Sequence, residues 1–240
     1  MRRSDEPELL DATGISDATL RRAYRELHAV NRFLGNTAAI VRLIRHDHAR
    51  SVLDIGCGQG ALLKEIRKQT GATVVGLDMR AAPLDAPVPI VTGNAVHDSL
   101  PQTDVAVCVL MAHHLSEEEV IGMIRNVSRS CERFILLDLV RHRVPLALFS
   151  LFVAPFLCAL NAADGKTSIR RAFTPREMRA IVDKALSGVG RQVARKRHMV
   201  APFWIRQVID IRWAGHNVSP AMQAQASHGS HAAHELDFGT

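Results

Sequence analysis

The most constraining feature of this sequence is the segment 52–60, VLDIGCGQG, in which an apolar run ends in a carboxylate and three alternating glycines follow. A glycine-rich turn between a strand and a helix lets the backbone approach a ligand closely and directs N–H groups toward it. The glycines also fit the dinucleotide fingerprint loosely, because Ala61 supplies its last position. The sequence Gly-Lys-Ser/Thr does not follow, which excludes a Walker phosphate-binding loop.

The carboxylate before the glycines separates the remaining alternatives. Asp54 would repel a pyrophosphate, but it can pair with a cationic ligand or accept a hydrogen bond from an amino group. The turn is therefore predicted to hold a ligand that carries a positive charge. A nicotinamide-dependent dehydrogenase remains as an alternative of lower rank.

Strand and helix patterns alternate after residue 50. Apolar runs typical of buried strands occupy residues 51–55, 73–77, 89–92, 104–111 and 134–140. Helix patterns lie at residues 61–69, 116–130 and 175–186, and two further strands at 191–200 and 203–211 can pair across Ala201-Pro202. We predict an α/β fold with a doubly wound, Rossmann-like, seven-stranded, mostly parallel sheet, a terminal antiparallel hairpin and an N-terminal helical extension.

The predicted organisation has three parts. Residues 1–50 form a helical cap, residues 51–213 the main domain, and residues 214–240, rich in Ser, His, Ala and Gln, a disordered tail. A substrate-covering insertion at about residues 141–173 interrupts the main domain. Within it, the polar residues 164–166 are expected to form a turn.

Composition narrows the class of protein. The chain of 240 residues is 47% hydrophobic and 22% charged, which is typical of a globular protein, and a net charge of +6 is a moderate excess that identifies no partner. Only 5% of the residues are aromatic, which disfavours a base-stacking platform for single-stranded nucleic acid. The four cysteines include no CxxC pair, and no apolar leader follows Met1, so we expect a reducing, cytoplasmic location.

Four segments, in order, resemble the motifs of the class I S-adenosylmethionine-dependent methyltransferases, in their small-molecule, quinone- or phenol-methylating branch. Residues 54–60 (DIGCGQG) are similar to the first motif and residues 74–78 (VVGLD) to the second. Residues 93–95 (GNA) resemble the third, and residues 104–115 the fourth strand and its Leu-His-His-Leu type of ending. The resemblance covers about residues 52–140 and implies S-adenosyl-L-methionine as the cofactor.

The resemblance also implies which residues hold this cofactor. They are Asp54, Gly56, Cys57, Gly58, Gly60, Asp78, Met79, Asn94, Ala95 and Leu110. In such enzymes the acid after the second strand accepts both ribose hydroxyls, a role that suits the two oxygens of Asp78. Asn94 replaces the more common Asp, so we expect slightly weaker adenine binding. We expect the Cys57 thiol to pack within the loop rather than to react.

His113 and His114 follow the fourth strand, at the sheet edge where open α/β folds bind ligands. Two interpretations stay open. One of the imidazoles acts as the general base that deprotonates a methyl acceptor, or both shape the pocket by packing and hydrogen bonding. No metal site is predicted, because the dense histidine groups, 46–48 and the tail residues His228, His231 and His234, fit adventitious binding better.

The acceptor is predicted from the insertion. Residues 144–160 carry no charge but contain two prolines. This pattern indicates an apolar lid or pocket wall, or a segment that docks shallowly on an anionic membrane. A buried connecting helix is the alternative. We therefore expect direct methyl transfer to a small, hydrophobic phenol, quinol or lipid-like acceptor. An RNA methyltransferase and a non-catalytic, methyltransferase-like interaction domain are the alternatives. The oligomeric state is not predicted.

Overall fold

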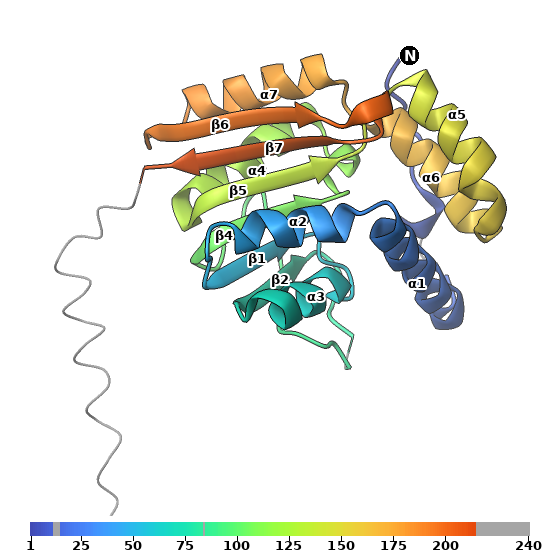
Figure 1. The fold of residues 1–240 in the computed structure, drawn as a ribbon, viewed down its shortest axis with the longest axis horizontal. Coiled ribbons are helices and arrows are strands. Elements are labelled where there is room, and N and C mark those ends of the chain that lie inside the picture. Colours follow the sequence, from blue (N-terminus) through green and yellow to red (C-terminus); the bar gives the residue numbers. More distant parts are fainter. Residues whose placement is uncertain (12–14, 84, 215–240) are drawn as a thin grey trace, which may run out of the picture.

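The computed structural model describes residues 1–11, 15–83 and 85–214 (Figure 1). The predicted tail therefore lies outside the described residues, apart from residue 214. The α-helices are α1 (Asp17–Phe33), α2 (Asn36–Arg45), α3 (Ala61–Thr70), α4 (Glu117–Ser130), α5 (Arg143–Phe152), α6 (Ala159–Arg171) and α7 (Pro175–Ser187). The strands are β1 (Ser51–Ile55), β2 (Thr73–Asp78), β3 (Ile90–Thr92), β4 (Thr103–Val109), β5 (Cys131–Asp138), β6 (Val193–Val200) and β7 (Gln207–Trp213).

The strands form one sheet in the order β3-β2-β1-β4-β5-β7-β6. The first five are parallel to one another, and β7 runs antiparallel to both β5 and β6. The predicted seven-stranded, mostly parallel sheet with a terminal hairpin is confirmed. Because strand order reverses between β1 and β4, the carboxyl ends of these two strands flank the point where open sheets bind ligands.

Each face of the sheet is covered by its own helices (Figure 1). One core unites alternate strand residues such as Leu53 and Phe134 with α4 and α7, and the other unites Val52 and Ile135 with α2 and α3. Ile40 of α2 is fully buried in the second core. Both long helices of the predicted cap, residues 1–50, are present, but only α2 packs on the sheet. The other, α1, lies at the carboxyl edge of the sheet beside α6.

Local sequence signals fix the starts of two core helices. The hydroxyl of Ser116 accepts a hydrogen bond from Glu119 N, and the Glu119 carboxylate accepts one from Ser116 N, which together cap α4. Thr174 and Glu177 make the same reciprocal pair at α7, with proline at its first helical position. Both predicted helix starts are confirmed.

The predicted turn at residues 164–166 is wrong, because these residues lie inside α6. The Asp164 carboxylate is buried and accepts hydrogen bonds from Leu9 N at 2.7 Å and Leu10 N at 2.8 Å. Gly165 packs directly under the ring of Phe149 in α5. Contacts with distant residues therefore override the low helix propensity of Asp and Gly.

Several strand boundaries also differ from the predicted ones. β4 ends at Val109 rather than at residue 111, and β5 occupies 131–138 rather than 134–140. β7 begins only at Gln207, because residues 202–204 form a short 3₁₀ turn in which Phe203 has a φ of 59°. The predicted hairpin is present, with a wider connection.

The uncharged stretch 144–160 is divided among α5, a 3₁₀ turn at Ala154–Phe156 and the start of α6. Only two of its residues, Pro145 and Ala154, are buried, while Leu151, Phe152 and Phe156 are exposed. It is therefore not a buried connecting helix. Within the described residues, no helix combines the length and apolar character needed to span a bilayer.

Candidate functional site

The glycine turn after β1 adopts a backbone that favours glycine at each of the three predicted positions. Gly56, Gly58 and Gly60 have φ angles of 72°, 54° and 76°. A Cβ at Gly56 would lie 2.5 Å from Cγ of Met111, so this glycine is required by both conformation and space. The turn thus brings bare backbone to the carboxyl ends of β1 and β4, as the sequence predicts for close approach to a ligand.

Asp78 ends β2 and faces the same turn. Its Oδ2 accepts a hydrogen bond from Gly58 N at 2.8 Å, and its Oδ1 accepts one from Arg80 N at 2.9 Å. A carboxylate has about four lone-pair positions, so each oxygen can still accept one more donor. This half-satisfied, oriented carboxylate fits a pair of ribose hydroxyls.

Asp54 is buried at the end of β1, with 3% of its surface exposed. Burial, assisted by the negative charge of Asp78, raises the pKa of Asp54 to about 8. No hydrogen bond to its carboxyl group comes from the described residues. A ligand with an amino group or a positive charge would offset the desolvation of this acid, so Asp54 and Asp78 together fit a cationic nucleoside such as S-adenosylmethionine.

The other predicted cofactor residues surround this turn with different roles. Asn94 Oδ1 accepts a hydrogen bond from Val96 N at 2.8 Å, so its side chain shapes the loop after β3. Ala95 is buried, whereas Met79 is 72% exposed, and Leu110 has a φ of 54° directly after β4. The approach of these four residues to adenine or to the methionine part stays a prediction.

Cys57 lies in the turn and packs against Gly76 of β2. Burial, together with the carboxylates of Asp54 and Asp78, raises the pKa of the Cys57 thiol far above its usual range. A thiol held in its neutral form is a poor nucleophile. This agrees with the expectation that Cys57 packs rather than reacts.

His113 and His114 lie in a short 3₁₀ turn, Ala112–His114, just beyond β4. His113 is buried, and its Nδ1 lies 2.7 Å from Oδ1 of Asp138 at the end of β5. Burial alone would lower the pKa of His113, but the carboxylates of Asp138 and Glu8 outweigh it and raise this pKa to about 9. The side chain of His114 is 27% exposed, so the two imidazoles have different environments.

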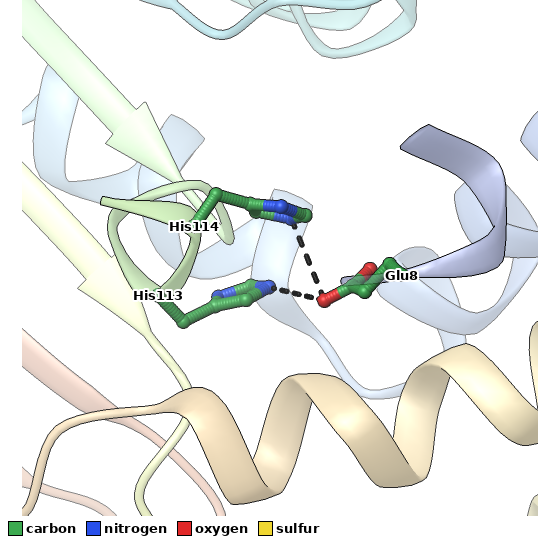
Figure 2. A group of neighbouring side chains, drawn as sticks. All are labelled: Glu8, His113 and His114. Atoms are coloured by element: carbon green, nitrogen blue, oxygen red, sulfur yellow. Dashed lines mark ion pairs between the residues drawn. The ribbon is translucent and has the colours of Figure 1, made fainter. Parts of the chain in front are cut away.

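Glu8 completes this group from the far N-terminal end of the chain (Figure 2). Its Oε1 lies 3.5 Å from Nε2 of His113 and 3.6 Å from Nε2 of His114, and it accepts a hydrogen bond from Ser168 Oγ of α6 at 2.7 Å. Burial tends to raise the pKa of Glu8, but the contact with His113 and the neighbouring His114 lowers it below its usual value. The sequence motifs did not indicate Glu8 or Asp138 as site residues.

The N-terminal segment is fixed over the carboxyl edge of the sheet by several contacts. The Arg3 guanidinium donates to the carbonyl oxygens of His113 and Leu115, at 3.2 Å and 2.6 Å. The Arg80 guanidinium donates to the carbonyl oxygen of Leu10 at 2.7 Å and to the Tyr24 hydroxyl at 3.3 Å. Arg3 therefore lies against the histidine turn, and Tyr24 of α1 lies beside Arg80 and the glycine turn at Gly58.

Comparison with known proteins agrees with this geometry. The family model described as a methyltransferase domain matches residues 52–133. The structure of the plantazolicin methyltransferase BpumL in complex with SAH aligns with a TM-score of 0.63 at 16% identity, covering 82% of this chain and 91% of that chain. Human N-acetylserotonin methyltransferase in complex with SAM aligns with a TM-score of 0.55 at 16% identity, covering 81% of this chain and 56% of that chain.

Curated relatives point the same way. The ubiquinone biosynthesis O-methyltransferase of Pseudomonas entomophila is 34% identical over 99 residues, which are 36% of this chain and 40% of that protein. The enzyme of that name from Pseudomonas fluorescens Pf-5 is 26% identical over 178 residues, which are 64% of this chain and 73% of that protein. The first of these matches thus spans well under two thirds of the relative's length.

The fold is that of the class I methyltransferases. The methyltransferase domain matched over residues 52–133, these relatives and this fold together support a class I S-adenosylmethionine-dependent methyltransferase, the family whose motifs the sequence resembles.

Proposed function

We propose that this protein transfers the methyl group of S-adenosylmethionine to a small, hydrophobic acceptor that carries a hydroxyl group. One observation carries the proposal: Asp54, one residue before the end of β1, and Asp78, at the end of β2, lie on either side of a glycine turn that presents bare backbone. The cofactor supplies a methyl group already activated by a neutral thioether leaving group. The chain then has to bind this cofactor, orient the acceptor, exclude water and receive the acceptor's proton.

The acceptor class rests on two kinds of support. The relatives named above are ubiquinone biosynthesis O-methyltransferases, whose name indicates oxygen as the methylated atom in those proteins. In this chain, α5 at the carboxyl edge is rich in apolar residues, and α5 and the 3₁₀ turn after it expose Leu151, Phe152 and Phe156. A phenol or quinol with an apolar body suits such surroundings.

We also propose that the same apolar residues allow peripheral contact with an anionic membrane. Arg143 is exposed at the start of α5, whose C-terminal end carries exposed Leu151 and Phe152. Aromatic and aliphatic side chains beside arginine are the combination that binds at lipid headgroups. A cytoplasmic enzyme with this surface could take its acceptor directly from the bilayer surface.

Within the histidine pair, His114 is the better candidate for the general base. His113 is buried and its Nδ1 is held by Asp138, whereas the side chain of His114 is partly exposed. A base must reach the acceptor hydroxyl, which requires exposure toward the acceptor. We assign His113 and Glu8 the role of positioning His114.

Calorimetry with S-adenosylhomocysteine tests the proposed cofactor site. Asp78→Ala removes the carboxylate proposed to bind the ribose and should weaken binding by about 1–3 kcal/mol, the scale of lost hydrogen bonds to a charged group. Asp85→Ala, at an exposed acid of the following loop, is the matched control and should leave binding unchanged. Equal affinities of the two variants would refute the ribose assignment.

Methylation assays with phenols, quinols and fatty acids then identify the acceptor class.

A further inference from the structure

Glu8, His113 and His114 place one oxygen and two nitrogen ligand atoms around a common point (Figure 2). The Glu8 Oε1 to His Nε2 separations are 3.5 Å and 3.6 Å, and all three atoms lie within 4.8 Å of one another. Separations of this size are long for hydrogen bonds. They are close to the roughly 3.3–3.5 Å between ligands that each lie about 2.0–2.1 Å from one tetrahedral zinc ion.

The surroundings of His113 match those of a metal ligand. Its Nδ1 hydrogen-bonds to the buried Asp138 carboxylate, which orients the ring so that Nε2 faces Glu8 and His114. Metal-binding histidines commonly donate their second N–H to a carboxylate in this way. Ser168 orients the third ligand by donating to Glu8 Oε1 at 2.7 Å. Each of the two buried members of the cluster is therefore held by an outer partner.

Charge in the neighbourhood selects the kind of ion. The carboxylates of Glu8 and Asp138 favour a cation, whereas the guanidinium groups of Arg3 and Arg171, which donate to the carbonyl oxygens of His113 and His114, oppose one. A hard ion such as Mg²⁺ gains little from imidazole ligands and prefers oxygen. Two imidazoles and one carboxylate suit zinc, which gains enough from nitrogen ligands to compete with this repulsion.

We propose that Glu8, His113 and His114 form a binding site for one divalent transition-metal ion, with Zn²⁺ as the preferred ion. Three protein ligands leave the fourth tetrahedral position open, which is the pattern of catalytic rather than structural zinc. If the proposed function holds, that position is available to the acceptor's hydroxyl oxygen. In the metal-bound protein His114 would then be a ligand and not the base, but metal binding itself does not depend on the proposed activity.

Cobalt(II) titration of the full chain, stripped of metal with a chelator, tests the site without any activity assay. Tetrahedral Co²⁺ absorbs visible light far more strongly than octahedral Co²⁺, so the spectrum reports the geometry as well as the stoichiometry. We expect one tetrahedral ion per chain, displaced by Zn²⁺ and not by Mg²⁺. No tetrahedral band, or an unchanged band in the variants below, overturns the proposal.

Glu8→Gln and His114→Gln remove one ligand each and should each weaken Co²⁺ binding by more than about 100-fold, beyond the roughly 10–100-fold expected for loss of an outer partner. Glu6→Gln, in the same segment but exposed, and His46→Gln, in the other histidine group, are matched controls that should bind normally. Thermal melting of each metal-free variant checks folding. If Glu8→Gln proves unfolded, the comparison of His114→Gln with His46→Gln decides alone.

Discussion

The proposed cofactor site (the cofactor end) and the proposed acceptor site (the acceptor end) are built in different ways. The cofactor end uses β1, β2 and the turn between β1 and α3, so that its acids and glycines lie within a contiguous segment of 25 residues, 54–78. The acceptor end gathers Glu8, the 3₁₀ turn after β4, Asp138 and Ser168, which are up to 160 residues apart in the chain. A site formed by one local turn can be predicted from a sequence motif, whereas a site formed by packing of distant segments cannot.

The electrostatics of the two ends also differ. At the cofactor end two acids share one turn, and burial and then the negative charge of Asp78 raise the pKa of Asp54. At the acceptor end each buried acid already has an imidazole neighbour, and the pKa of Glu8 is lowered. The buried acid of the first end has no imidazole beside it, whereas Glu8 and Asp138 of the second end each lie beside His113. Three changes below test this difference.

The largest effect should follow from filling the glycine turn. Gly56→Ala places a Cβ 2.5 Å from Met111 Cγ at a φ of 72°, so it should abolish measurable S-adenosylhomocysteine binding and lower the melting temperature. Gly71→Ala is the matched control, because Gly71 has a φ of 74° and nothing within 4 Å of the added atom. It should lose about 1–2 kcal/mol of stability from backbone strain and keep its affinity. If the two variants lost affinity equally, backbone strain rather than close approach would explain the glycines.

An intermediate effect should appear in the pH dependence of cofactor binding. Because the pKa of Asp54 is about 8 in the free protein, the acid is largely protonated below that pH and must ionise to pair with a cationic ligand. We expect S-adenosylhomocysteine affinity to rise with pH by up to about 10-fold per unit between pH 6 and 8, with proton release seen by calorimetry in two buffers. Asp54→Asn should bind more weakly and without this slope. A flat profile in the unaltered protein would contradict the assignment.

The smallest effect concerns the attachment of α1 at the acceptor end. Glu26 of α1 accepts hydrogen bonds from Cys158 N and Asn161 Nδ2, both at 2.9 Å, and the first of these contributes most to lowering its pKa to about 2. The stabilisation is therefore present above a pH of about 4.5 and is lost as the pH falls toward 2.

Glu26→Gln should lower the free energy of unfolding by about 1 kcal/mol at pH 7, since the side chain is partly exposed, and by less at pH 3. Urea unfolding at both pH values measures it. Glu65→Gln, at a glutamate of α3 that is likewise half-buried but bonded only within its own helix by Gln69, is the control. Equal losses for the two variants at pH 7 would show that Glu26 does not fasten α1 to α6.

Sequence patterns alone predicted the sheet, its terminal hairpin, the starts of α4 and α7 and the glycine turn. These features depend on short-range rules: period-two or continuous apolar runs, residues three apart at helix starts, and glycine where φ is positive. The predicted turn at residues 164–166 failed, because Asp164 is engaged by the backbone of residues 9 and 10, which no local pattern reveals. The stretch 144–160 is interrupted by the 3₁₀ turn that contains Pro155, because proline lacks the backbone N–H that a continuous helix needs.

The sequence determined where the acids Asp54 and Asp78 and the glycines lie, since each strand end and turn is encoded within a few residues. Only the tertiary structure brought Glu8 to the histidine pair and Asp138 behind it. The physical reason is that a buried charge needs a partner wherever the chain can supply one, and the supplier is chosen by the packing of distant elements rather than by spacing along the chain.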